Sequence, residues 1–214
     1  MKQLFQFLIF LILGVSIVFF SCKKENNTPV ILEATTINNL HSDTILGLNQ
    51  QGQPYGNGKY TLFSLESNSI ISNSDSATTK WDVGFRGTTI ITNGGNSGPG
   101  NGGAFVYVGT FSDLKEIAAD SIFRVDNAPA SYAIPIGSNK GWYVYNPQTN
   151  LVTPIPGRVL VIKTANGKYA KLEILNYYKG GVTPDASASD DDKLKKQRFY
   201  TFRYIIQRDG SKKF

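Results

Sequence analysis

Short runs of β-favouring residues recur along the chain from about residue 60 to its end, and turn signals separate them. Aromatic and β-branched side chains dominate these runs, as suits a pleated and partly buried surface. The runs are YTLFSL (60–65), KWDVGF (80–85), TTIIT (88–92), AFVYVGTF (104–111), GWYVYN (141–146), GRVLVIKT (157–164), KYAKLEILNYY (168–178) and RFYTFRYIIQR (198–208). The pattern predicts an all-β fold, a single domain of many short, mostly antiparallel strands.

Side-chain alternation in the last run, 198–208, predicts which of its two faces forms the core. Both faces hold bulky groups, and one of them is the more apolar, so it is expected to be buried. The residues of that face are Tyr200, Phe202, Tyr204 and Ile206. Asn166-Gly167 lies between two of the runs and predicts a tight hairpin there.

Helix signals are scarce, which limits the expected fold to at most one short helix. Only FSDLKEIAADSIF (111–123) looks helical, with Ser112 as a candidate N-cap and Glu116 near the first turn. The segment DASASDDDKLKK (185–196) is acidic and then basic, and it is expected to be a mobile polar loop.

The N-terminal segment has the organisation of an export signal. A positive start is followed by the apolar run LFQFLIFLILGVSIVFF and then by Ser21-Cys22. The run is nearly long enough to span a membrane as a helix, so its length alone does not decide between the two. A cysteine after a small residue at this place is where bacterial lipoproteins are cleaved and receive diacylglycerol. The sequence therefore predicts lipidation at Cys22.

These signals divide the chain into a signal peptide (1–21), a polar tether (22–34) and a β domain (35–214). Cys22 is the only cysteine, so a lipidated chain has no disulfide and depends on its core for stability. The formal net charge of +6 is not gathered into one stripe, which argues against a nucleic-acid partner.

No set of residues typical of an enzyme is present, and we expect no catalytic activity. The glycine-rich run NGGNSGPGNGGA (93–104) lacks the phosphate-loop motif and lies between strands, so it is interpreted as a structural loop. His41 is the only histidine, in a segment expected to be weakly ordered. The acidic triplet 190–192 lacks the spacing of a calcium-binding loop.

Aromatic side chains gather around the run GWYVYN (141–146), with Tyr132 shortly before it. Alternation places Tyr143 and Tyr145 on one face and Trp142 on the other. Two interpretations stay open: ordinary packing of aromatic strands, or a stacking wall for a flat ligand.

Three blocks of the chain resemble HmuY-like proteins in their order and spacing, from roughly residue 55 to the end. They are YTLFSLESNSIIS (60–72), KWDVGFRGTTIITNGGNSGPGNGGAF (80–105), and GRVLVIKTANGKYAKLEILNYY (157–178) with FYTFRYIIQ (199–207). HmuY-like proteins are mostly β, haem-binding lipoproteins of Bacteroidetes. The resemblance implies a lipid-anchored protein of the outer membrane, at the cell surface, that captures haem for iron acquisition and passes it to an outer-membrane haem receptor.

The sequence departs from this family at the iron ligands, which are two histidines in the best-known member and methionines in some relatives. The matching stretches, roughly 120–138 and 146–154, contain neither residue type. Haem or a related tetrapyrrole would then be held by unusual or weakened ligation. Tyrosine can ligate haem iron. The candidate haem-binding residues are Tyr132, Tyr143, Tyr145 and His41.

A second function remains open beside haem capture. The chain would then be a non-catalytic surface interaction lipoprotein that keeps the fold and binds no haem.

Overall fold

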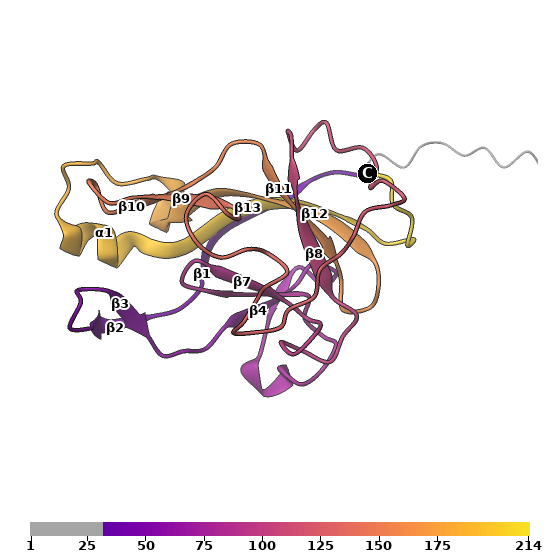
Figure 1. The fold of residues 1–214 in the computed structure, drawn as a ribbon, viewed down its shortest axis with the longest axis horizontal. Coiled ribbons are helices and arrows are strands. Elements are labelled where there is room, and N and C mark those ends of the chain that lie inside the picture. Colours follow the sequence, from indigo (N-terminus) through magenta and orange to yellow (C-terminus); the bar gives the residue numbers. More distant parts are fainter. Residues whose placement is uncertain (1–31) are drawn as a thin grey trace, which may run out of the picture. The chain divides into compact units, whose positions relative to one another are not determined.

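The computed structural model describes residues 32–214, and in this range the largest sheet has five antiparallel strands in the order β1–β13–β12–β11–β8 (Figure 1). Their bounds are β1 Thr35–His41, β8 Gly103–Val108, β11 Arg158–Lys163, β12 Tyr169–Tyr178 and β13 Gln197–Gln207. A second sheet has the order β5–β4–β6–β7. Its strands are β4 Thr61–Ser64, β5 Ser69–Ile71, β6 Val83–Arg86 and β7 Thr89–Thr92.

Two hairpins stand apart from these sheets. One pairs β2 with β3 and the other pairs β9 with β10, both antiparallel. Their bounds are β2 Ile45–Leu48, β3 Pro54–Gly56, β9 Tyr143–Asn146 and β10 Leu151–Pro154. All strand pairs of the described range are antiparallel, which confirms the all-β prediction.

Aromatic side chains fill the core between the two sheets. Phe202 of β13 lies 5.7 Å from Phe63 and 5.4 Å from Phe85, measured between ring centroids, and both partners belong to the second sheet. The face of β13 predicted to be buried is at most 7% exposed at each of its four positions. The prediction from alternation is therefore confirmed.

The segment 111–123 is not the helix that its sequence suggests. It follows a series of turns, and Phe111, Leu114 and Ile117 pack on the outer face of the large sheet. Nζ of Lys171 donates to the carbonyl oxygens of Phe111 and Leu114, at 2.9 and 2.7 Å. Because a lysine of the sheet satisfies these carbonyl groups, the segment can bury its apolar residues without helical hydrogen bonds.

The only α-helix among residues 32–214 is α1, Asp190–Lys196, in the segment predicted to be a mobile loop. The side chain of Ser189 accepts a hydrogen bond from the Asp192 amide and caps its start. Three aspartates occupy the first turn and three lysines the last, an order that favours the helix dipole. The two short 3₁₀ helices are η1 Asn73–Asp75 and η2 Lys179–Gly181.

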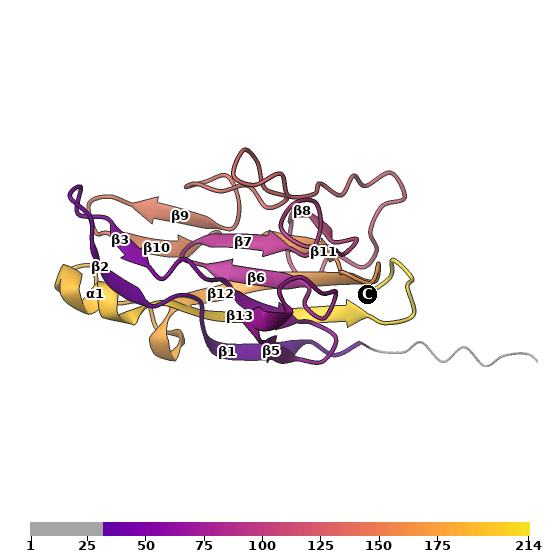
Figure 2. The same ribbon diagram turned by 90° about the horizontal axis from the view of Figure 1, so that it is seen from below.

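The segment around His41 was expected to be weakly ordered, but Thr35–His41 forms the edge strand β1 and pairs with β13. The predicted signal peptide, the lipidation site Cys22 and most of the tether lie outside the described residues. Leu32 packs in the same apolar cluster as Phe214. The C-terminus lies at the end of the sheets away from the two hairpins (Figures 1 and 2). Among the described residues, no helix is long and apolar enough to cross a membrane.

Candidate functional site

A cleft of about 940 Å³ lies between the hairpin β2–β3 on one side and β9–β10 with α1 on the other. Both views place these elements together at one end of the sheets (Figures 1 and 2). The volume is within the range of about 300–1,000 Å³ typical of small-molecule pockets. The cleft is therefore the candidate ligand site of the described residues.

The floor of the cleft rests on a cluster of buried aromatic rings. Trp142, Tyr177 and Tyr200 contact one another with ring centroids 5.2–5.6 Å apart. These rings come from the residue before β9, from β12 and from β13. Tyr177 lines the cleft, and burial raises its pKa well above the usual range, so it remains a neutral phenol. The cluster gives the site a rigid base.

One wall of the cleft is joined to α1 by a chain of side-chain hydrogen bonds. The Tyr145 hydroxyl donates to Oδ1 of Asn150 at 2.6 Å. Nδ2 of Asn150 donates in turn to Oδ1 of Asp190 at 3.1 Å. Val152 of β10 and Leu194 of α1 add apolar surface to this wall. The hairpin β9–β10 and the helix therefore present one combined surface to the cleft.

The opposite wall, the hairpin β2–β3, is fixed at its base by a buried ion pair. Nη1 of Arg198 lies 3.3 Å from Oδ2 of Asp43, and the two side chains are 8% and 5% exposed. Nη2 of Arg198 donates to the Pro54 carbonyl oxygen at 3.2 Å. Arg198 has a φ of +70°, a backbone conformation that a residue with a side chain rarely adopts. Leu48 offers exposed apolar surface on this wall.

The structure brings two of the four predicted haem-binding residues into this cleft. Tyr143 is nearly buried and its hydroxyl accepts a hydrogen bond from Oγ1 of Thr88 at 3.3 Å, whereas Tyr145 is 41% exposed. Tyr132 lies elsewhere, against a small apolar cluster around Trp81. Which of these residues contacts a ligand stays a prediction.

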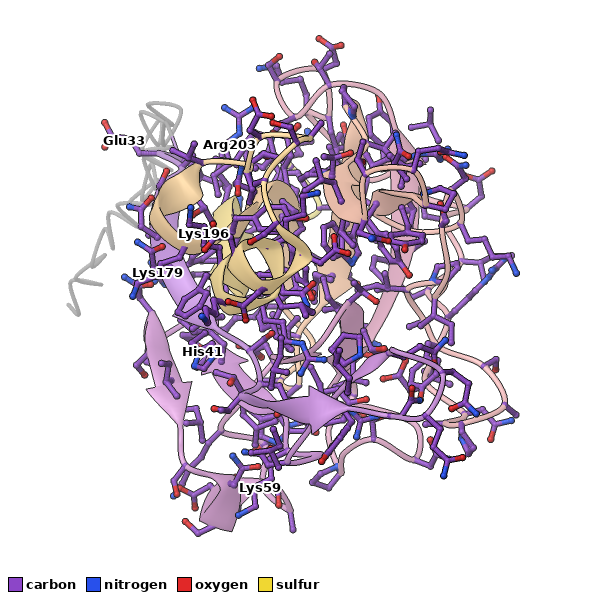
Figure 3. The ribbon with its side chains drawn as sticks, turned by 90° about the vertical axis from the view of Figure 1, so that its left-hand side faces the viewer. Glu33, His41, Lys59, Lys179, Lys196 and Arg203 are labelled. Atoms are coloured by element: carbon purple, nitrogen blue, oxygen red, sulfur yellow. The ribbon has the colours of Figure 1, made fainter. Side chains whose placement is uncertain are left out.

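His41 lies at the edge of β1, outside the lining of the cleft. Its ring stacks on Phe199 with the centroids 4.4 Å apart, and Nζ of Lys179 lies 5.7 Å from the centroid of the same phenylalanine ring. Figure 3 shows His41 and Lys179 close together. Burial is the largest influence on His41 and lowers its pKa below the usual value. Within residues 32–214, no three His, Cys, Asp or Glu side chains come together in a way that could hold a metal ion.

Sequence reasoning missed the residues that form the wall at β2–β3 and the nearby turn. Asp43, Arg86 and Arg198 line the cleft from three different parts of the chain. No local pattern marks them, because Asp43 and Arg198 are 155 positions apart in sequence. Only the fold brings these charged groups to one site.

The fold and the cleft define an all-β protein that holds its candidate site between two projecting hairpins. A family model described as HmuY protein matches residues 57–188. The chain therefore belongs to the HmuY family, which confirms the resemblance seen in the sequence. No protein with a curated description matches the chain.

Two solved structures are similar to this chain at low sequence identity. A candidate lipoprotein from Bacteroides fragilis is 15% identical, with 68% of this chain and 83% of that chain covered and a TM-score of 0.44. The apo form of a HmuY analogue from Tannerella forsythia is 17% identical, with 83% of this chain and 96% of that chain covered and a TM-score of 0.41.

Proposed function

We propose that this chain is a surface lipoprotein that binds haem or a related tetrapyrrole in the cleft between β2–β3 and β9–β10. The single observation that carries the proposal is the cleft itself, about 940 Å³ in volume and partly lined by tyrosines in a HmuY-family chain. A tetrapyrrole is a flat, largely apolar ring, and such ligands favour clefts with aromatic and aliphatic walls.

The lining of the cleft offers the two faces that a flat ring requires. Tyr143 and Tyr145 lie on one wall together with Val152 and Leu194, and Leu48 lies on the other. Tyr145, at 41% exposure, and Leu48, at 52%, are exposed large side chains, so a ligand between them would remove apolar surface from water. This burial of apolar surface favours binding of the ring with or without ligation of its metal.

Only a few residues of the cleft lining are of a type that ligates haem iron. None of the cleft-lining residues is a histidine, methionine or cysteine, and the phenol oxygens of Tyr143 and Tyr145 are the donors that haem iron accepts. His41 lies outside the cleft, so in the proposal it does not ligate iron. A complex of this kind lacks the six-coordinate signature of two histidines or two methionines.

In the proposed location, a lipid on Cys22 holds the chain at the outer membrane, where it captures haem at the cell surface and passes it to an outer-membrane receptor. No step of this function requires catalysis by the chain.

Titration of the purified protein with ferric haem tests the proposal through the Soret band. We expect binding with a high-spin ferric spectrum, and a complex that weakens as the pH falls, because protonation removes a phenolate ligand. Tyr143→Phe or Tyr145→Phe, whichever removes the ligand, should change the spectrum and weaken binding about tenfold or more, equivalent to at least about 1.4 kcal/mol. Phenylalanine keeps the ring and its burial, so the change separates ligation from stacking.

Tyr132→Phe is the matched control, because Tyr132 lies outside the cleft and should leave the spectrum unchanged. If all three variants keep the wild-type spectrum, ligation by Tyr143 or Tyr145 is wrong. If the wild-type protein shows no Soret change, the haem proposal fails and the chain is better described as an interaction lipoprotein that retains the fold.

A further inference from the structure

Three cationic side chains line the cleft, and they differ in their acidic partners. Arg198 pairs with Asp43, and Nζ of Lys193 lies 3.8 Å from Oδ1 of Asp190. Within residues 32–214, no carboxylate pairs with the guanidinium of Arg86. Arg86 is thus the one cation of the cleft lining that has no ion pair with an acidic group of residues 32–214.

The guanidinium of Arg86 is nevertheless held in place. Its Cζ lies 4.3 Å from the centroid of the Tyr60 ring, and Nη1 donates to the Gly58 carbonyl oxygen at 3.0 Å. Burial raises the pKa of Tyr60 to about 12, so this ring stays a neutral phenol and adds no negative charge. These two contacts use one face and one N–H of the group, which has five N–H donors in all.

The turn that follows Arg86 is fixed to the aromatic cluster under the cleft. The Tyr200 hydroxyl donates to the Gly87 carbonyl oxygen at 2.8 Å. Nε1 of Trp142 donates to the Thr88 carbonyl oxygen at 3.0 Å. Both donors come from rings of the cleft floor, so Arg86 is presented from a rigid support. A preorganised cation of this kind loses little entropy on binding an anion.

We propose that Arg86 binds a carboxylate of the ligand, so that the cleft selects flat apolar carboxylates whether or not they carry a metal. The inference rests on the proposed function, since it concerns the ligand of the same cleft. A guanidinium and a carboxylate form charge-assisted, often paired hydrogen bonds, stronger than those between neutral groups. With the apolar walls around the ring, recognition then depends on the ring and its acid group.

Two probes that share one porphyrin ring and differ in whether their acid groups are esterified test the role of Arg86. Metal-free protoporphyrin has two carboxylates, and its dimethyl ester has none. Binding of each is followed by porphyrin fluorescence in one buffer with a fixed fraction of dimethyl sulfoxide. We expect the wild-type protein to bind the dicarboxylate about 10- to 100-fold more tightly than the diester, as expected for a hydrogen bond between charged groups.

Arg86→Gln should remove this preference by weakening only the dicarboxylate, and Arg86→Lys should give an intermediate preference because it keeps the charge without the planar group. Arg124→Gln makes the same change in charge at an exposed arginine outside the cleft lining and should behave as wild type. Thermal unfolding checks that each variant is folded. If Arg86→Gln does not fold, the preference of Arg86→Lys for the dicarboxylate tests the role of Arg86.

An equal loss of affinity for both porphyrins in the Arg86 variants would overturn the role of Arg86, and so would an unchanged preference for the dicarboxylate. Either result would leave the cleft as the binding site. If the wild-type protein binds neither the porphyrins nor ferric haem, the proposed function itself fails. The two failures are therefore distinguishable.

Discussion

Replacing Asp43 with alanine is expected to destabilise the protein by about 3–5 kcal/mol, because Arg198 would be left as a buried charge without its partner. The pair is separated by 3.3 Å, and both side chains are more than nine-tenths buried. Asp43 also accepts a hydrogen bond from the Asn57 amide, which the substitution removes. Urea unfolding followed by circular dichroism measures the loss of stability.

The double variant Asp43→Ala with Arg198→Met separates the ion pair from the cost of an isolated charge. Without either charge, the loss should be clearly smaller than the sum of the two single losses, because neither side chain is left unpaired. Additive losses would show that Asp43 and Arg198 contribute independently and would contradict the importance given to their contact.

A second large effect is expected for Gly95→Ala in the glycine-rich loop. Gly95 has a φ of +62°, and a Cβ atom added there would lie 1.9 Å from the Asp126 carbonyl oxygen. The backbone would have to move away, which breaks the hydrogen bond from the Asn96 amide to that oxygen. The left-handed conformation and the lost hydrogen bond together cost about 2–5 kcal/mol.

Gly210→Ala is the matched control for Gly95→Ala. Gly210 has a similar φ of +82°, but a Cβ atom there would have no neighbour within 4 Å. It should cost only the conformational term, about 1–2 kcal/mol. Thermal unfolding of Gly95→Ala and Gly210→Ala measures the two losses of stability. Equal losses for the two variants would contradict the role assigned to the close approach of Gly95 and Asp126.

Sequence patterns predicted the central strands well because these strands are long and carry apolar residues on a defined face. The edge strand β1 was missed, since its sequence TTINNLH is mostly polar and only Leu40 in it is fully buried. Pairing with β13 stabilises β1 through backbone hydrogen bonds, which any sequence can make. A strand of this kind leaves little hydrophobic periodicity to detect.

The two errors about helices have different physical causes. Local signals favoured a helix at 111–123, but contacts with the large sheet and with Lys171 offered that segment better partners. At α1, the segment is polar throughout and was expected to be a loop, but the Ser189 cap and the order of its charges stabilise a short helix. Tertiary contacts override weak helix propensity in the first segment, and N-terminal capping stabilises a helix in the second.

Side-chain alternation predicted one wall of the candidate site, but nothing in the sequence predicted the facing wall. Placing Tyr143 and Tyr145 on one face required only the period of a strand, and both line the cleft. The facing wall depends on the contact of Arg198 with Asp43 and on the turn that presents Arg86. Neither feature has a local sequence signal. The ion pair joins distant segments, and the turn after Arg86 is held by Trp142 and Tyr200, which are also distant along the chain.

Amide chemical-shift mapping of the isotope-labelled protein, titrated with metal-free protoporphyrin, tests most directly whether the cleft is the ligand site. The porphyrin is diamagnetic, so its ring current shifts nearby amide signals without broadening them by an unpaired electron. We expect the largest shifts at Leu48, Thr88, Tyr145 and Leu194, on both walls of the cleft. We expect little change at Lys171, whose side chain contacts the 111–114 segment on the outer face of the large sheet. Saturable shifts gathered at another surface, or none at all, would contradict the assignment of this cleft as the binding site.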